Sequence, residues 1–218
     1  MRLPRIFKYV SLPGLKLLNH AFFVATMRDL SWQEPLFASI HRGQRNRLLA
    51  FGPGSISTGL VLARRFPDFT IIAAHPSRKA IEGARRNIAN RDIPNLAAVE
   101  APSHERLPFD ASTFDVVILL LTLHDRSPEE KLFISKEMLC VLRRGGTLHV
   151  ADYDSPTCPR EGVILGMSRY ISGESATNPH VDGSWTQCFR SAGFAGVRRI
   201  ASHSISIGRI STLTARKR

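Results

Sequence analysis

Short apolar runs alternate with amphipathic stretches from residue 45 onward, and this alternation predicts a parallel sheet with helices between its strands. Four apolar runs are expected to be strands, at residues 48–51, 68–74, 96–99 and 114–121. Ser127 and Pro128 are expected to begin a helix that stops at Gly145-Gly146, and a fifth strand follows at residues 147–151. Repeated units of this length indicate an α/β, doubly wound sheet.

A glycine turn follows the first expected strand, and the rest of the chain is organised around it. Residues 52–54 read Gly-Pro-Gly and lead into an amphipathic stretch, TGLVLARRF, with helical spacing. Such a turn lets the backbone approach a ligand and points helix N–H groups at it, so it commonly holds a nucleotide-like cofactor. Two glycines also serve any tight strand-to-helix turn, and a purely structural role stays open.

The last third of the chain differs in composition. Residues 154–182 are rich in Gly, Pro and Ser, which predicts a loop with a short helix lying over the strand ends. A helix over residues 183–194 is expected to end at Gly193. The last two runs alternate like an antiparallel hairpin, with Gly208-Arg209 between them.

Residues 1–44 stand apart from the sheet-forming region, because apolar positions alternate there with arginines and lysines. No stretch approaches the ~20 uncharged apolar residues that a membrane span needs, and no small-residue cleavage site of a secretory signal is present. Two interpretations remain: a helical lid or cap on the domain, or a basic amphipathic helix that contacts an anionic membrane. We expect a single domain overall, with residues 1–44 as the lid or cap and residues 45–218 as the α/β domain.

Composition sets outer limits on partners and location. The 218 residues include 30 Lys and Arg against 18 Asp and Glu, a net charge of +12 that favours an anionic partner. The charge is spread along the chain without a long basic tract, so no specific nucleic-acid partner is predicted. Cys140, Cys158 and Cys188 are odd in number and far apart, which predicts free thiols, no metal site and a reducing, cytoplasmic location.

Four blocks in a fixed order carry a resemblance to a known family. They are LLAFGPGS at 48–55, LPFDASTFDVV at 107–117, LHD at 123–125 and VLRRGGTLHVADYDSP at 141–156. With the closing SAGFAGVRRI and TARK, they make the chain from about Arg45 to Arg218 similar to the class I S-adenosylmethionine-dependent methyltransferases. It is most like the small-molecule branch that includes ubiquinone and menaquinone biosynthesis. The resemblance implies a Rossmann-like, seven-stranded, mostly parallel sheet with a C-terminal antiparallel hairpin, and S-adenosylmethionine over the carboxyl ends of the first strands.

The same resemblance identifies cofactor-binding positions and exposes departures at several of them. The implied positions are Gly52, Pro53, Gly54, His75, Pro76, Ser103, His104 and Leu120. The family usually has acids where this chain has Ala50, His75 and Ser103, and a third glycine where it has Ile56. Because a hydrogen bond to a charged group contributes about 1.5–3 kcal/mol, His75 in place of the ribose-binding acid weakens binding by roughly tenfold to a hundredfold.

His75 has three interpretations. It can accept one hydrogen bond and donate another to a ribose, it can be a satisfied loop histidine, or it can accommodate a phosphate together with Arg78 and Lys79. The third interpretation points to a different, phosphate-bearing ligand.

The sulfonium of S-adenosylmethionine is already activated, so the side chains of a methyltransferase mainly align the nucleophile with the methyl group and exclude water. His124 follows the fourth strand and is the first candidate for a general base or a substrate-positioning group. It can equally be a structural histidine bonded to Asp125 or to a carbonyl. Asp152, Tyr153 and Asp154 are expected to line the opposite wall, and the candidate substrate-binding residues are Tyr153, His180 and Trp185.

Two functions therefore remain. The first is an S-adenosylmethionine-dependent methyltransferase acting on a small-molecule metabolite. The second is a degenerate methyltransferase-fold protein that has lost this cofactor and serves as a scaffold or binds another ligand, which the absent carboxylates favour.

Overall fold

A computed structural model of the chain describes residues 12–29, 31–41, 45–102 and 105–218. The strands are β1 (Arg47–Phe51), β2 (Thr70–His75), β3 (Leu96–Glu100), β4 (Phe114–Leu120), β5 (Leu142–Tyr153), β6 (Ala195–Ile205) and β7 (Gly208–Arg216). The helices are α1 (Leu12–Arg28), α2 (Glu34–Ala38), α3 (Ser55–Arg65), α4 (Arg78–Asn90), α5 (Pro128–Val141), α6 (Val163–Ser172), α7 (Glu174–Asp182) and α8 (Gln187–Ala192), with a 3₁₀ turn, η2, at Ser184–Thr186.

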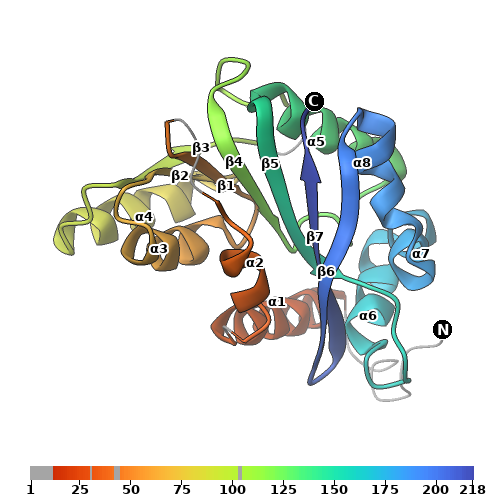
Figure 1. The fold of residues 1–218 in the computed structure, drawn as a ribbon. Coiled ribbons are helices and arrows are strands. Elements are labelled where there is room, and N and C mark those ends of the chain that lie inside the picture. Colours follow the sequence, from red (N-terminus) through yellow and green to blue (C-terminus); the bar gives the residue numbers. More distant parts are fainter. Residues whose placement is uncertain (1–11, 30, 42–44, 103–104) are drawn as a thin grey trace.

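The strands form one seven-stranded sheet in the order β3-β2-β1-β4-β5-β7-β6 (Figure 1). β1 to β5 run parallel, and β7 lies antiparallel to both β5 and β6. The order reverses at β1, which places the carboxyl ends of β1 and β4 at the crevice where open α/β sheets bind ligands. The predicted fold class, mostly parallel with a terminal antiparallel hairpin, is confirmed.

The two faces of the sheet bury separate cores, because successive strand residues point to opposite faces. Leu48 and Ala50 of β1 pack in a cluster with residues of α2 and α3, whereas Leu49 and Phe51 pack in a cluster with residues of α5 and α8. β4 is buried at every position, as its continuous apolar run predicts for a central parallel strand.

The start of α5 follows the sequence prediction, but its end does not. Ser127 and Glu130 form a capping box, with each side chain accepting from the other's backbone N–H. The helix ends at Val141, and Gly145 and Gly146 lie inside β5 instead of stopping the helix. A Cβ on Gly146 would lie 2.9 Å from the Leu142 side chain, so this glycine permits close backbone approach within the sheet.

Residues 154–182, expected to be mainly loop, contain the two helices α6 and α7. Ile164, Leu165 and Met167 are buried, and this apolar surface stabilises α6 despite the surrounding Gly, Pro and Ser. The predicted hairpin turn at Gly208-Arg209 is wrong by two residues, because β7 begins at Gly208 and the turn is Ser206-Ile207.

The described part of the N-terminal segment packs on the domain. α1 contacts α6, and α2 contacts β5, β6 and β7. The segment between them is fixed by Trp32, fully buried, whose Nε1 donates to the Thr26 carbonyl at 2.8 Å. Within the described ranges, none of the helices has the length and apolar character needed to cross a membrane. Arg2, Arg5 and Lys8, which supply much of the expected membrane-facing charge, lie outside those ranges.

Candidate active site

The glycine turn lies at the carboxyl end of β1, between β2 and the turn that follows β4. The Gly52 N–H donates to the Ala74 carbonyl, and Gly52 has φ +108°, a conformation that favours glycine. A Cβ on Gly52 would lie 2.1 Å from Thr122 Oγ1, so no other residue fits. Pro53 is exposed at the tip of the turn, and the buried Gly54 caps the N-terminus of α3.

Two side chains cover Gly54. A Cβ on Gly54 would lie 2.9 Å from Met27 Cε and 3.6 Å from the Cβ of Leu120, the fully buried last residue of β4. Met27 belongs to the last turn of α1, so the N-terminal helix contacts the glycine turn directly. Leu120, one of the implied cofactor positions, does lie beside the turn.

His75 ends β2 and closes the other side of the turn. Its Nδ1 accepts from the Ser77 N–H at 2.9 Å, and the ring also bonds the Pro53 backbone. Burial lowers the pKa of His75, which favours the neutral imidazole. Pro76 is half-buried in the bend that follows. Nδ1 of His75 is thus engaged within the protein, while Ser103 and His104 lie outside the described residues.

The turn after β4 is held in a strained but well-bonded conformation. Leu121 has φ +47°, which a leucine rarely adopts, and its N–H donates to the Ala151 carbonyl. The N–H groups of Thr122 and Leu123 donate to Asp152 Oδ2 at 2.9 and 2.7 Å. The carboxylate from the end of β5 therefore fixes the backbone that precedes His124.

The same carboxylate orients His124. Nδ1 of His124 lies 2.9 Å from Asp152 Oδ1, which also accepts the Tyr153 N–H at 2.8 Å. Burial alone would lower the pKa of His124, but the Asp152 charge outweighs it and the pKa is raised. Burial opposes ionisation of Asp152 too, yet the His124 charge and the hydrogen bonds hold its pKa below the usual value. With Nδ1–H directed at Asp152, His124 Nε2 is the atom available to accept a proton.

The three candidate substrate residues lie together around His124, and all are buried. The Tyr153 ring meets His124 edge-on at 4.7 Å between centroids, and its hydroxyl lies 3.4 Å from Thr26 Oγ1 of α1. The His180 ring stacks on Trp185 at 4.8 Å, and its Nδ1 bonds the Tyr153 carbonyl at 2.5 Å. Burial lowers the pKa of His180 to about 4 and keeps it neutral, and its buried Nε2 has no hydrogen-bond partner within the described structure.

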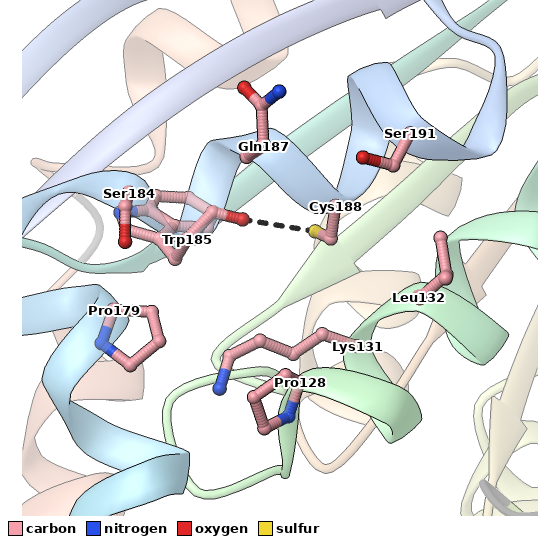
Figure 2. Close-up of a pocket in the computed structure, with 9 residues that line it drawn as sticks. All are labelled: Pro128, Lys131, Leu132, Pro179, Ser184, Trp185, Gln187, Cys188 and Ser191. Carbon is pink, nitrogen blue, oxygen red and sulfur yellow. Dashed lines mark hydrogen bonds between the residues drawn. The ribbon is translucent and has the colours of Figure 1, made fainter.

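A separate open pocket lies between α5, α7 and α8 (Figure 2). Its volume is about 340 Å³, and its walls are mainly apolar. It is lined by Pro128, Lys131, Leu132, Pro179, Ser184, Trp185, Gln187, Cys188 and Ser191. Of the sequence-predicted site residues, only Trp185 contributes to this pocket.

The structure therefore brings most predicted site residues to one edge of the sheet, around the carboxyl ends of β1, β4 and β5. Sequence reasoning placed Asp152 on a wall of the site but missed its part as the hydrogen-bond centre, and it missed Met27 and Lys131 altogether. The acids in VADYD at the end of β5 are a readable signal for Asp152. The contact of Met27 with Gly54 has no sequence signal, because it depends on how α1 folds back.

Comparison with known proteins relates part of this chain to a known family. Residues 48–146 match the model of the family described as "Methyltransferase domain". The match covers the glycine turn, His75 and His124, and extends into β5. No curated protein matches the chain in a sequence comparison.

Solved structures agree on the methyltransferase fold. The chain is similar to PigF with SAH (TM-score 0.68, 17% identity, 95% of this chain and 58% of that chain). It is also similar to human N-acetylserotonin methyltransferase in complex with SAM (TM-score 0.66, 14% identity, 97% and 57%) and to YcgJ from Bacillus (TM-score 0.65, 13% identity, 85% and 99%). The chain thus spans a little over half the length of the first two. The methyltransferase resemblance is confirmed at the level of fold and domain, and the quinone-biosynthesis branch stays a prediction.

Proposed function

We propose that this chain is an S-adenosylmethionine-dependent methyltransferase that acts on a small-molecule acceptor. The observation that carries the proposal is the position of the buried His124–Asp152 pair, at the carboxyl ends of β4 and β5, beside the glycine turn after β1. In a methyltransferase domain this arrangement supplies a backbone cradle and a proton acceptor at one edge of the sheet. That PigF and N-acetylserotonin methyltransferase were solved with SAH and SAM supports the choice of cofactor.

The residues present fit this cofactor at the glycine turn and less well at β2. Gly52 adopts a conformation reserved for glycine, and a Cβ on Gly54 would fill the space against Met27 and Leu120. These residues would hold the methionine portion. At β2, Nδ1 of His75 already accepts from the Ser77 N–H, so a ribose contact through that nitrogen requires this bond to open.

The bound cofactor supplies an activated methyl group, and the chain's residues do the remaining work. Asp152 holds the His124 ring so that Nε2 can accept a proton from an acceptor hydroxyl. The Asp152 charge, which raises the pKa of His124, stabilises the imidazolium that forms. Tyr153, His180 and Trp185 exclude water from this proton and would pack against the acceptor once α1 and α7 make room for it.

We further propose that α1 is the lid of this site. Met27 packs on Gly54, and the Thr26 hydroxyl lies beside that of Tyr153, so the last turn of α1 covers both cofactor and acceptor positions. Contact of the basic N-terminal stretch with an anionic membrane, and a cytoplasmic location in keeping with free Cys140, Cys158 and Cys188, are parts of the same proposal.

Calorimetric titration with S-adenosylmethionine and S-adenosylhomocysteine tests the proposal, with NADPH as the control ligand. Saturable binding of the first two and none of NADPH is the expected result. The second candidate function, a methyltransferase-fold protein without this cofactor, is favoured by the engaged His75 ring and by Met27 over Gly54. NADPH binding without S-adenosylmethionine binding would establish that candidate instead.

A further inference from the structure

The pocket between α5, α7 and α8 has the properties of a small-molecule site (Figure 2). Its volume of about 340 Å³ falls in the range of clefts that hold small organic ligands. Pro128 and Pro179 form parts of its walls, and their restricted backbones favour a pocket that exists before a ligand arrives. Neither the glycine turn nor His124 lines it, and of the residues assigned to the proposed site of methyl transfer it shares only Trp185.

Lys131 gives this apolar pocket a buried positive charge. The side chain has only 2% exposure, and its Nζ donates to the Ala176 carbonyl at 2.6 Å and to the Arg126 carbonyl. An ammonium has three N–H donors, so one donor remains after these two bonds. Among the described residues, no carboxylate lies within ion-pair distance of Lys131.

The neighbouring groups do not neutralise this charge. Asp152 acts on Lys131 from a distance, but its oxygens already accept from His124 and three backbone N–H groups. Asp125 and Glu130 also act from a distance, and both pair with Arg126. Burial raises the pKa of Cys188 to about 11, so its thiol stays uncharged at neutral pH, and its Sγ donates to the Trp185 carbonyl at 3.0 Å. Burial accordingly lowers the pKa of Lys131, as expected for an ammonium without a counterion.

We propose that this pocket is a second binding site, for a small apolar organic anion. The apolar body of the ligand packs against Trp185 and Leu132, and its carboxylate accepts the remaining N–H of Lys131. A buried charge is costly in free energy unless it is paired, so an anionic ligand provides the counterion that the fold does not give Lys131. An uncharged molecule of the same shape packs against the apolar walls but leaves the Lys131 ammonium without a counterion.

Titration calorimetry of the full chain with 2-naphthoate, and with neutral 2-naphthylmethanol as the matched probe, tests the proposal. Because a hydrogen bond to a charged group contributes about twice as much as a neutral one, we expect 2-naphthoate to bind about tenfold or more tightly than the alcohol. Lys131→Met removes the charge and should abolish that preference. Lys136→Met, an exposed lysine on the same helix, is the matched control and should preserve it.

A second variant keeps the test independent of whether Lys131→Met folds. Ser191 is exposed at the pocket wall, so Ser191→Phe should fill the pocket and weaken both probes by tenfold or more without unfolding the domain. S-adenosylmethionine binding by this variant should be unchanged, because none of the residues proposed to hold that cofactor lines this pocket. The proposal is overturned if the wild-type chain shows no preference for 2-naphthoate, if Lys131→Met retains the preference, or if Ser191→Phe binds both probes normally.

Discussion

His124 and Asp152 form a buried pair, with Nδ1 and Oδ1 2.9 Å apart, although 28 residues separate them in the sequence. The pair forms because β4 and β5 are adjacent and parallel, so the residues at their carboxyl ends meet. Its geometry leaves one imidazole nitrogen as proton acceptor and ties the other to a carboxylate.

Replacement of His124 tests its part in turnover. We expect His124→Ala to lower the turnover rate by about 10²-fold or more with nearly unchanged affinity for S-adenosylmethionine, because general-base contributions have this size and the turn that binds cofactor is untouched. Steady-state kinetics and calorimetry on the same preparation measure both. His203→Ala, a histidine on β6, serves as the control. Losses of thermal stability and activity in parallel would indicate a structural histidine instead.

The pH profile tests the part of Asp152. Because the pKa of His124 is raised, the rate should increase with pH through a midpoint above 6.5, where the ring loses its proton. Asp152→Asn removes the charge that favours imidazolium, so the midpoint should move to lower pH by about one unit or more and the maximal rate should fall. Asp154→Asn, two residues along, should leave the midpoint in place. An unmoved midpoint in Asp152→Asn would exclude this electrostatic coupling.

Gly54 tests the cofactor turn. We expect Gly54→Val to abolish S-adenosylmethionine binding while the sheet remains folded, because a branched side chain would occupy the space where backbone meets ligand. The nearest atom to the new Cβ is the mobile end of Met27, which can shift. Gly83→Val on α4 is the matched control, since nothing lies within 4 Å of a Cβ there. Unchanged affinity in folded Gly54→Val would show that the cofactor binds elsewhere.

His75 separates the two candidate functions. We expect His75→Asp to tighten S-adenosylmethionine binding by about 1–3 kcal/mol, because one carboxylate oxygen can keep the Ser77 N–H while the other accepts from the ribose. A phosphate-bearing ligand such as NADPH should bind more weakly to the same variant, through charge repulsion. His75→Asn controls for shape without charge. No gain over wild type in calorimetric titration would count heavily against the active-enzyme proposal.

Met27 tests the lid. We expect Met27→Ala to open the space beside Gly54 and speed cofactor association, while the lost packing lowers the free energy of unfolding by about 2–3 kcal/mol. Stopped-flow binding and denaturant unfolding measure the two effects. Leu36→Ala, which removes a buried side chain of α2 away from the turn, should destabilise the fold without faster association. Slower association in Met27→Ala would mean that Met27 forms part of the binding surface.

The central strands could be predicted because each is a continuous apolar run, and the start of α5 because its capping residues act locally. The stretch 154–182 could not, because α6 and α7 owe their stability to tertiary burial of residues such as Ile164 and Met167, which composition does not reveal. The prediction that Gly145-Gly146 ends α5 was wrong. A glycine pair is typical of a helix end, and the sequence alone does not show that a strand requires close backbone approach at this position.

The candidate site divides in the same way. The glycine turn, His124 and the acids at the end of β5 lie at strand ends, so their positions could be predicted from the sequence. The burial of His180 depends on residues far away in the sequence, and the hydrogen bond of His75 with Ser77 depends on the geometry of the loop. Lys131 is the sharpest case, because a lysine in the first turn of a helix is ordinarily solvated and here is enclosed by α7.

Asp152 serves both the stability of the fold and the proposed chemistry of the site. Its carboxylate accepts two backbone N–H groups of the β4 turn, one of its own strand and the His124 ring. If random variants are sorted only by the amount of intact protein in cells, substitutions at Asp152 should therefore be as rare among the abundant variants as substitutions at core leucines. The position of the site would emerge from abundance alone, before any substrate is known.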